Sequence, residues 1–283
     1  MSAREDLLEL ARRAESGTAA APDPLWAALT VDAQQARRAA VLMLFGILDD
    51  VPAVSGKPLA PADLDVLLLE RAHTLGSHPG QVAFPGGAID ARETPVQAAL
   101  REAEEETGLD SGGVEVLGTL QELGLAHSNF LVTPVLGWWR SPSPVRVVDY
   151  AESAQVFRVP VRDLLDPDNR VMATVHRAGR SFDSPAFTVN GVVVWGFTGI
   201  VLNGLFEQLG WAVPWDRSRL HRMGVSPQAC CWRRSTTTPV AAFSRTALIP
   251  SSNVLTDLNL GETATVLPSA SVSRNLYDSS PTR

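Results

Sequence analysis

The chain has 283 residues, of which 45% are hydrophobic and 19% are charged, and its formal net charge is -7. This composition is typical of a globular protein, and the acidic balance argues against a protein that holds nucleic acid on a basic surface. No apolar run is long enough to cross a bilayer, and the N-terminus lacks the basic-then-apolar order of a secretory signal, so we expect no membrane insertion and a cytoplasmic location.

The first residues predict a helical lead-in, which we place at residues 1–37. Apolar positions from Leu7 to Ala11 suit one face of a short helix, and a Pro-containing break over residues 21–24 separates it from a second helical stretch expected through residues 33–40. Strand-like apolar runs then follow at residues 40–48 and 66–69. The main domain is expected to cover residues 38–216.

Within this domain the apolar spacing changes to that of a helix over residues 94–107. Further strands are expected at 114–120, 130–138, 156–161, 171–176 and 187–194, and a closing helix at 200–209. The strands follow one another too closely for a regular parallel array, so the pattern favours a mixed α/β (α+β) fold. Residues 217–283 are rich in Ser, Thr, Pro and Arg, and we expect most of this tail to be disordered.

Three glutamates on the predicted helix point to metal chemistry. Glu102, Glu105 and Glu106 stand at i, i+3 and i+4, so they should project from one helix face beside the apolar stripe. Carboxylates gathered in this way repel one another unless a divalent cation binds. A hard ion such as Mg²⁺ suits oxygen ligands and can activate water against a diphosphate. The sequence does not choose between Mg²⁺ and Mn²⁺.

Residues around the helix suit the same site. Gly86 and Gly87 permit a tight loop into the helix and let backbone carbonyls approach a metal, and Gly108 suits the helix end. Arg101 and Glu93 are placed to pair across the loop and the helix, which would fix the catalytic face.

The segment from Gly87 to Leu109 resembles the Nudix box at every specified position. That box reads Gly, five residues, Glu, seven residues, then Arg-Glu-apolar-any-Glu-Glu-any-Gly-apolar. The resemblance implies a Nudix fold, in which a mixed sheet is sandwiched between helices and carries a loop-helix-loop cassette. It also implies that Glu102 and Glu106 are the principal Mg²⁺ ligands and that Glu105 is a further ligand or the group that deprotonates water. The implied catalytic group is Glu105, Arg101, Glu93 and Glu102, and the implied metal group is Glu102, Glu106, Glu105 and Gly87.

Just upstream, a second set of residues matches a known motif in register: Leu67, Leu68, Arg71, Ala72, Gly80, Phe84, Pro85, Gly86 and Gly87. This segment resembles the motif of the coenzyme A diphosphatases within that family, although Leu69 replaces its threonine. Gly76, however, stands where the motif has its second arginine, the side chain suited to fork a phosphate. The resemblance implies hydrolysis of coenzyme A to 3′,5′-ADP and 4′-phosphopantetheine. The substrate-binding residues that it implies are Arg71, Gly80, Phe84, Pro85 and Gly86.

Other interpretations stay open. Because of Gly76, the substrate could instead be ADP-ribose or NADH, and a non-catalytic Nudix-fold nucleotide-binding module is a third reading that the intact glutamates oppose. Glu152 could supply a fourth carboxylate, although an exposed loop acid is the simpler interpretation. His73 and His78 flank the expected substrate loop and could touch phosphate or adenine, but we assign them no catalytic part because no carboxylate spacing accompanies them. The expected partner is a small nucleotide substrate; the oligomeric state, a homodimer included, stays open.

Overall fold

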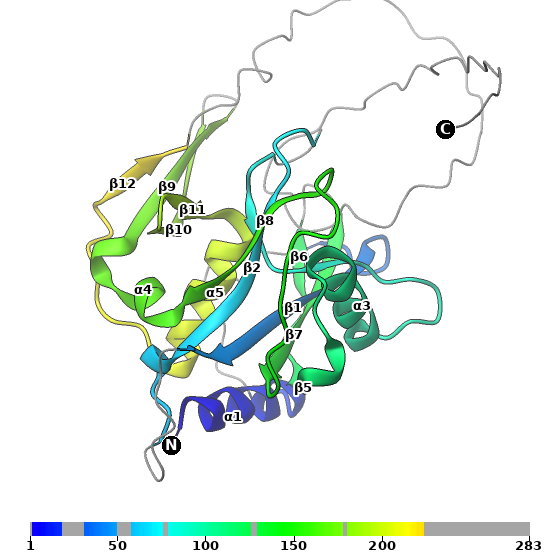
Figure 1. Cartoon of the computed structure of the whole chain (residues 1–283). Coiled ribbons are helices and arrows are strands. Elements are labelled where there is room, and N and C mark those ends of the chain that lie inside the picture. The colour runs from blue at the N-terminus through cyan, green and yellow to red at the C-terminus, as the bar shows by residue number, and fades with distance from the viewer. Residues whose placement is uncertain are drawn as a thin grey trace, which may run out of the picture.

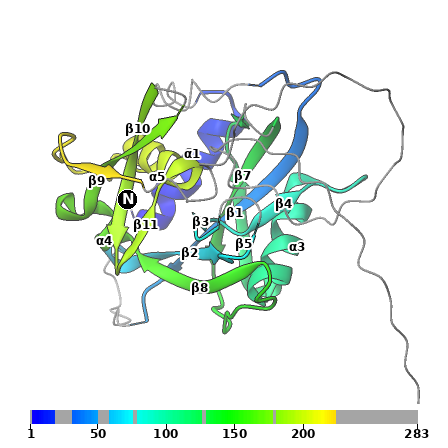
Figure 2. The ribbon, with the colours of Figure 1, turned by 90° about the horizontal axis from the view of Figure 1, so that it is seen from above.

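The computed structural model describes residues 2–18, 31–49, 58–75, 79–125, 129–177 and 180–223. Within these ranges the chain forms an eight-stranded mixed sheet and a four-stranded sheet, with helices on both faces of the first sheet (Figures 1 and 2). The larger sheet has the core order β3-β2-β1-β7-β5, with β4, β6 and β8 attached to its flanks. Among its described pairs, β1 runs parallel to β7 and the others are antiparallel. This confirms the expected mixed sheet sandwiched between helices.

The strands of the larger sheet are β1 (Arg37–Ile47), β2 (Leu64–Arg71), β3 (Val82–Ala83), β4 (Gly86–Ala88), β5 (Val114–Thr119), β6 (Leu123–Leu125), β7 (Phe130–Trp139) and β8 (Ser153–Pro160). The smaller sheet contains β9 (Arg170–Arg177), β10 (Arg180–Val189), β11 (Val192–Val194) and β12 (Leu220–Arg222). The helices are α1 (Ala3–Glu15), α3 (Pro95–Thr107), α4 (Val161–Leu165) and α5 (Gly196–Leu209), and short 3-10 turns lie at Pro61–Asp63, Ser111–Gly113 and Pro167–Asn169.

Strand β1 lies at the centre of the fold and is buried on both faces. Its even-numbered residues, such as Leu42 and Leu44, pack with the alanines of α3. Its odd-numbered residues, such as Val41 and Phe45, belong to the larger core that α1 and α5 complete. Alternate residues of a strand point to opposite faces, so a continuous apolar run is what a doubly covered strand requires. Figure 2 shows α3 on one side of β1 and β7, and α1 and α5 on the other.

The N-terminal lead-in is part of this core. Helix α1 begins with a capping box between Ser2 and Glu5, and it buries Leu7, Leu10 and Ala11. The second helix expected through residues 33–40 is wrong, because residues 33–36 form turns and β1 starts at Arg37. The basic and small residues there pair with β7, and tertiary pairing outweighs their helix propensity.

The expected single strand over residues 187–194 is also wrong, because it is a hairpin of β10 and β11. The chain turns at Asn190 and Gly191, which have φ angles of 50° and 83°. Asn-Gly is the strongest short-range hairpin signal, so this turn was readable in the sequence.

The domain end expected at residue 216 is too early. Leu220–Arg222 form β12, which pairs in parallel with β9, and the Met172 N–H donates to the Arg219 carbonyl at 2.8 Å. The rest of the expected tail, residues 224–283, lies outside the described residues, as do Gly76 and His78. Among the described helices, none combines the length and the apolar character needed to cross a membrane.

Candidate active site

The segment that leads into α3 pairs with two strands of the larger sheet. Strand β3 pairs with β2, and a few residues later β4 pairs with β1, where Gly87 lies opposite Ala40. The Leu42 N–H donates to the Pro85 carbonyl at 2.8 Å between these two pairings. This backbone pairing fixes Gly86 and Gly87 in the sheet, on the face that α3 covers.

Helix α3 is positioned by its two ends and its apolar face. Thr94 caps its start in a capping box with Gln97, Pro95 occupies its first turn, and Gly108 ends it with a φ of 67°. Ala98, Ala99 and Ala103 are fully buried against β1 and β7. These small side chains allow a close helix-to-sheet approach, which confirms the predicted helix and its capping glycine.

The close approach presses two glutamates onto the glycine loop. Glu102 is 1% exposed, and a Cβ built on Gly87 would lie only 2.3 Å from its carboxylate, so any larger residue at position 87 would displace that carboxylate. Glu106 is 7% exposed, and its Oε2 accepts a hydrogen bond from the Gly86 N–H at 3.0 Å. Both carboxylates are therefore held at fixed positions against backbone.

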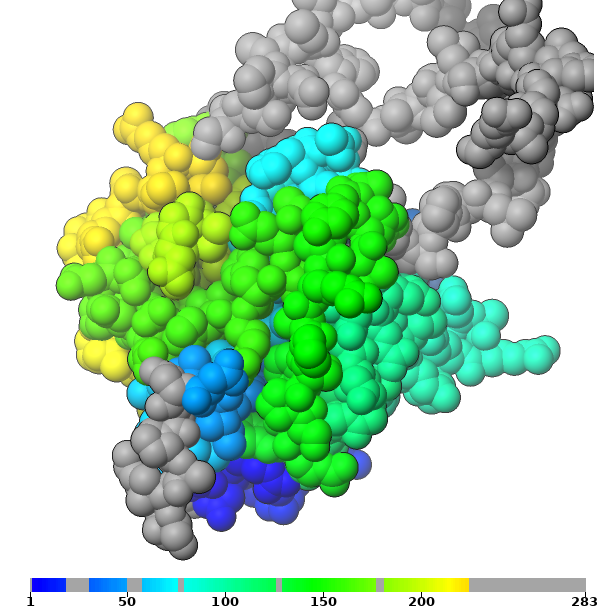
Figure 3. All heavy atoms as spheres, in the orientation of Figure 1, coloured from blue at the N-terminus to red at the C-terminus, as the bar shows by residue number. Residues whose placement is uncertain are grey.

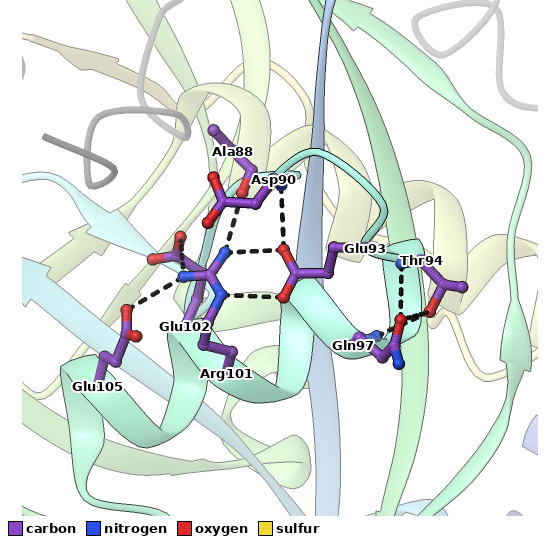
Figure 4. Close-up of polar contacts among 8 residues, drawn as sticks. All are labelled: Ala88, Asp90, Glu93, Thr94, Gln97, Arg101, Glu102 and Glu105. Atoms are coloured by element: carbon purple, nitrogen blue, oxygen red, sulfur yellow. Dashed lines mark hydrogen bonds and ion pairs between the residues drawn. The ribbon is translucent and has the colours of Figure 1, made fainter. Parts of the chain in front are cut away.

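Arg101 ties the loop to the helix (Figure 4). It donates two hydrogen bonds to Glu93, from Nε at 2.9 Å and from Nη2 at 3.0 Å, so the two residues that were expected to pair form a bidentate ion pair. Its Nη2 also donates to the Ala88 carbonyl, and its Nη1 donates to Glu102 at 2.9 Å and to Glu105 at 3.1 Å. One guanidinium thus orients three glutamates and a loop carbonyl, and it holds the pKa of Glu93 below its usual range.

The positive groups near the two buried carboxylates, Glu102 and Glu106, do not offset the cost of burying them. Burial raises the pKa of Glu102 to about 7, although the hydrogen bond and charge of Arg101 act in the opposite direction. Burial likewise raises the pKa of Glu106 to about 8; the Gly86 N–H and the charge of Arg71 lower it, and the charges of Glu102 and Glu152 add to the increase. A bound cation would remove this penalty, so the pair fits a metal ligand set.

The third helix glutamate is oriented differently. The side chain of Glu105 is 57% exposed and faces Arg101 and solvent, on the outer side of α3 (Figure 4). Within the described residues, no three His, Cys, Asp or Glu side chains are gathered closely enough to hold a metal by themselves. The structure thus brings together Glu102 and Glu106. Mg²⁺ commonly binds to one or two carboxylates and takes its remaining ligands from water and substrate phosphate.

Glu152 approaches this pair from the start of β8. Its carbonyl accepts a hydrogen bond from the Ala72 N–H at 2.9 Å, next to a bulge between Glu70 and Arg71 where β2 pairs with β8. Its charge acts on both Glu102 and Glu106. The loop after β2 and the segment before β8 lie side by side at the top of the molecule (Figure 3). Glu152 is half-buried there, a more specific placement than the exposed loop acid of the simpler interpretation.

The residues of the upstream motif separate into two groups. Phe84 is 1% exposed in the core, and Pro85 is also buried, so their side chains shape the loop and are not presented to a substrate. Arg71 is 4% exposed, and its charge reaches Glu106. Gly80 has a φ of 72° and donates its N–H to the Arg71 carbonyl at 3.1 Å, which closes the loop after β2.

His73 has the carboxylate partner that sequence reasoning did not find. Its Nε2 lies 3.2 Å from Oε1 of Glu70, whose side chain is only 12% exposed, whereas the side chain of His73 is 73% exposed. Glu70 and His73 stand three positions apart where β2 ends, so neither strand nor helix periodicity predicts their contact from the sequence.

Comparison with known proteins identifies the family. Residues 52–178 match the NUDIX domain model. A protein named uncharacterized Nudix hydrolase NudL from Photorhabdus laumondii is 36% identical over 145 residues, which is 51% of this chain and 76% of that protein. Its namesake from Salmonella paratyphi B is 38% identical over 146 residues, or 51% and 75% of the two chains. The chain belongs to the Nudix hydrolase family. It is therefore a hydrolase of the group that acts on nucleoside diphosphate derivatives.

Solved structures of the family also resemble the chain. The Nudix hydrolase RenU from M. smegmatis is 28% identical, with a TM-score of 0.35, and covers 44% of this chain and 70% of its own. The Nudix domain of Shewanella oneidensis NrtR, solved with ADP ribose, is 21% identical, with a TM-score of 0.35, and covers 51% and 87%.

Proposed function

We propose that this Nudix hydrolase cuts the diphosphate linkage of coenzyme A in a Mg²⁺-dependent reaction. The observation that carries the proposal is the pair of buried carboxylates, Glu102 and Glu106, held against the glycine loop with too little positive charge around them. A protein that only binds a nucleotide has no use for this costly arrangement, since buried carboxylates whose partners do not offset the cost of burial destabilise the fold.

Glu102 and Glu106 would hold the ion, with the Gly87 carbonyl as a further ligand and Glu105 as either a ligand or the group that deprotonates water. A Mg²⁺ ion at this position would neutralise charge on the diphosphate and lower the pKa of a bound water. Glu152, whose charge already acts on both inner carboxylates, is suited to join them, and we call Glu102, Glu106 and Glu152 together the acidic site.

The remaining residues have orienting and proton-transfer roles in this proposal. Arg101 and Glu93 keep the loop carbonyl of Ala88 and the carboxylate of Glu102 in fixed positions. Glu105 is exposed on the helix and bonded to Arg101, so a change of rotamer lets it turn inward and accept a proton from the attacking water. Its rotation would leave Arg101 bound to Glu93 and Glu102.

The choice of coenzyme A depends on the upstream motif. The charge of Arg71 reaches Glu106, and Gly80, a residue of the motif, donates its N–H to the Arg71 carbonyl. Gly76, where the motif has an arginine, lies outside the described residues. This departure is the specific observation that favours a second candidate, hydrolysis of ADP-ribose or NADH.

Product analysis tests the proposal. The full-length protein should be incubated in the presence of Mg²⁺ with coenzyme A, ADP-ribose or NADH, each in a separate reaction. The products should be identified by mass spectrometry. We expect 3′,5′-ADP and 4′-phosphopantetheine as the main products from the panel. If ADP-ribose or NADH is cut and coenzyme A is not, that compound replaces coenzyme A as the proposed substrate. If none of the three is cut with Mg²⁺ or Mn²⁺, the proposed function is refuted.

A further inference from the structure

The loop after β2 presents an aromatic ring that is fixed on two sides. One edge of His73 is held by Glu70, at 3.2 Å between Nε2 and Oε1. The ring also lies directly against Gly80, because a Cβ at that position would be 2.7 Å from Cε1 and 2.8 Å from Nδ1. Gly80 in turn donates its N–H to the Arg71 carbonyl. Ring, glycine and strand end therefore form one connected unit.

Most of this fixed ring faces solvent. The side chain of His73 is 73% exposed, although two contacts already restrict its rotamers. A ring that is held before a ligand arrives loses little side-chain entropy when the ligand binds. Histidine is among the side chains on which nucleic-acid bases stack.

The location of the ring suits the base end of a nucleotide substrate. The His73 ring rests on Gly80, which is bonded to the Arg71 carbonyl, and the charge of Arg71 reaches Glu106. A base is separated from the diphosphate by a ribose, so it must bind beyond the groups that hold the phosphates. A phosphate is disfavoured beside His73, because the carboxylate of Glu70 would repel it at the same edge. A neutral base meets no such repulsion.

We propose that His73, oriented by Glu70 and seated on Gly80, is the platform on which the purine base of the substrate stacks. This inference rests on the proposed function in that it takes a nucleoside diphosphate derivative as the substrate. It assigns His73 a role in specificity, and it leaves the bond-breaking step to the acidic site.

The test measures the binding of a ligand that carries a base separately from the binding of a ligand that carries only phosphates. The binding of 5′-AMP, which carries a purine, and of pyrophosphate, which carries none, should be measured by calorimetry with the full-length protein in Mg²⁺. We expect His73→Ala to weaken 5′-AMP binding by about tenfold, as for other stacked bases, and to leave pyrophosphate binding unchanged. His73→Phe retains a ring and should bind 5′-AMP within about threefold of the unsubstituted protein. His176, an exposed histidine on β9, supplies the control His176→Ala, which should change neither value.

Three results would overturn the proposed stacking role of His73. The first is unchanged 5′-AMP binding in His73→Ala, and the second is an equal loss of pyrophosphate binding in that variant, which would assign the ring to a phosphate. The third is a His73→Phe variant that binds 5′-AMP as weakly as His73→Ala does. Because binding is measured without turnover, these results are distinct from a failure of the proposed hydrolysis. If coenzyme A is hydrolysed, His73→Ala should also raise its KM by about tenfold with little change in kcat.

Discussion

Replacing Glu106 by Gln should stabilise the metal-free protein. The substitution preserves the shape of the side chain, and the amide oxygen of the introduced glutamine can still accept the hydrogen bond that the Gly86 N–H gives to Glu106. What it removes is a buried carboxyl group whose pKa is raised to about 8 from an ordinary value of 4.5, so that near neutral pH the group must take up a proton when the chain folds. The amide of glutamine is neutral in both states and needs no proton uptake on folding.

The size and the pH range of the effect follow from that shift. The folded protein holds the proton of Glu106 more tightly than the unfolded chain does, so the free energy of unfolding should fall as pH rises from about 4.5 to about 8. At about pH 7 the protein lies well above the pKa of the unfolded chain, so most of this loss in the free energy of unfolding is present. At roughly 1.4 kcal/mol per pH unit the loss is on the order of 3 kcal/mol. Below about pH 4 the penalty vanishes, because the carboxyl group is protonated in both states.

Urea unfolding at several pH values, with EDTA and then with Mg²⁺, checks this expectation. In EDTA the Glu106→Gln variant should be more stable than the unsubstituted protein near neutral pH, and this advantage should disappear in acid. Mg²⁺ should stabilise the unsubstituted protein and have little effect on the variant. Glu104→Gln is the matched control, because Glu104 is exposed on the same helix. A variant that is less stable at every pH would refute the charge argument.

Three further changes test the loop, the guanidinium and the domain end. Gly87→Ala places a Cβ where the Glu102 carboxylate lies, and a displacement of about 1 Å should lower kcat by about a hundredfold with little change in the circular dichroism spectrum. Arg101→Lys loses the bidentate fork, so the free energy of unfolding measured in urea should fall by about 1.5 to 3 kcal/mol. Truncation after residue 216 removes β12 and should lower the Tm by a few degrees relative to truncation after residue 223, and equal Tm values would contradict that role for β12.

The cassette around α3 could be predicted because its information is local. Helical spacing places Glu102 and Glu106 on one face, and the separation of Glu93 from Arg101 matches a single loop-to-helix contact. What spacing could not show is the depth of burial. The alanines of α3 let the helix approach the sheet so closely that two carboxylates lie inside and Glu105 stays outside. That distinction depends on packing and not on periodicity.

Features built from distant segments were not readable in the same way. Strand β12 is three residues long with no apolar alternation, and it becomes a strand because the edge of β9 offers hydrogen-bond partners. Arg170 is fully buried between Phe187 and Trp215, although its sequence context is that of a surface residue. The His73 contact was missed for a simpler reason, since only a folded loop brings Gly80 under the ring.

The most direct test of the catalytic role of the two buried carboxylates is kcat for Mg²⁺-dependent hydrolysis of coenzyme A, or of whichever diphosphate the protein cuts, in three variants. Glu102→Gln and Glu106→Gln each replace a proposed metal ligand on the buried side of α3, whereas Glu104→Gln replaces an exposed glutamate that is outside the site. We expect kcat to fall at least about a hundredfold in each of the first two variants, with the fold retained, and to stay within about twofold in the third. Near-normal turnover in both Glu102→Gln and Glu106→Gln would contradict the assignment of the metal site.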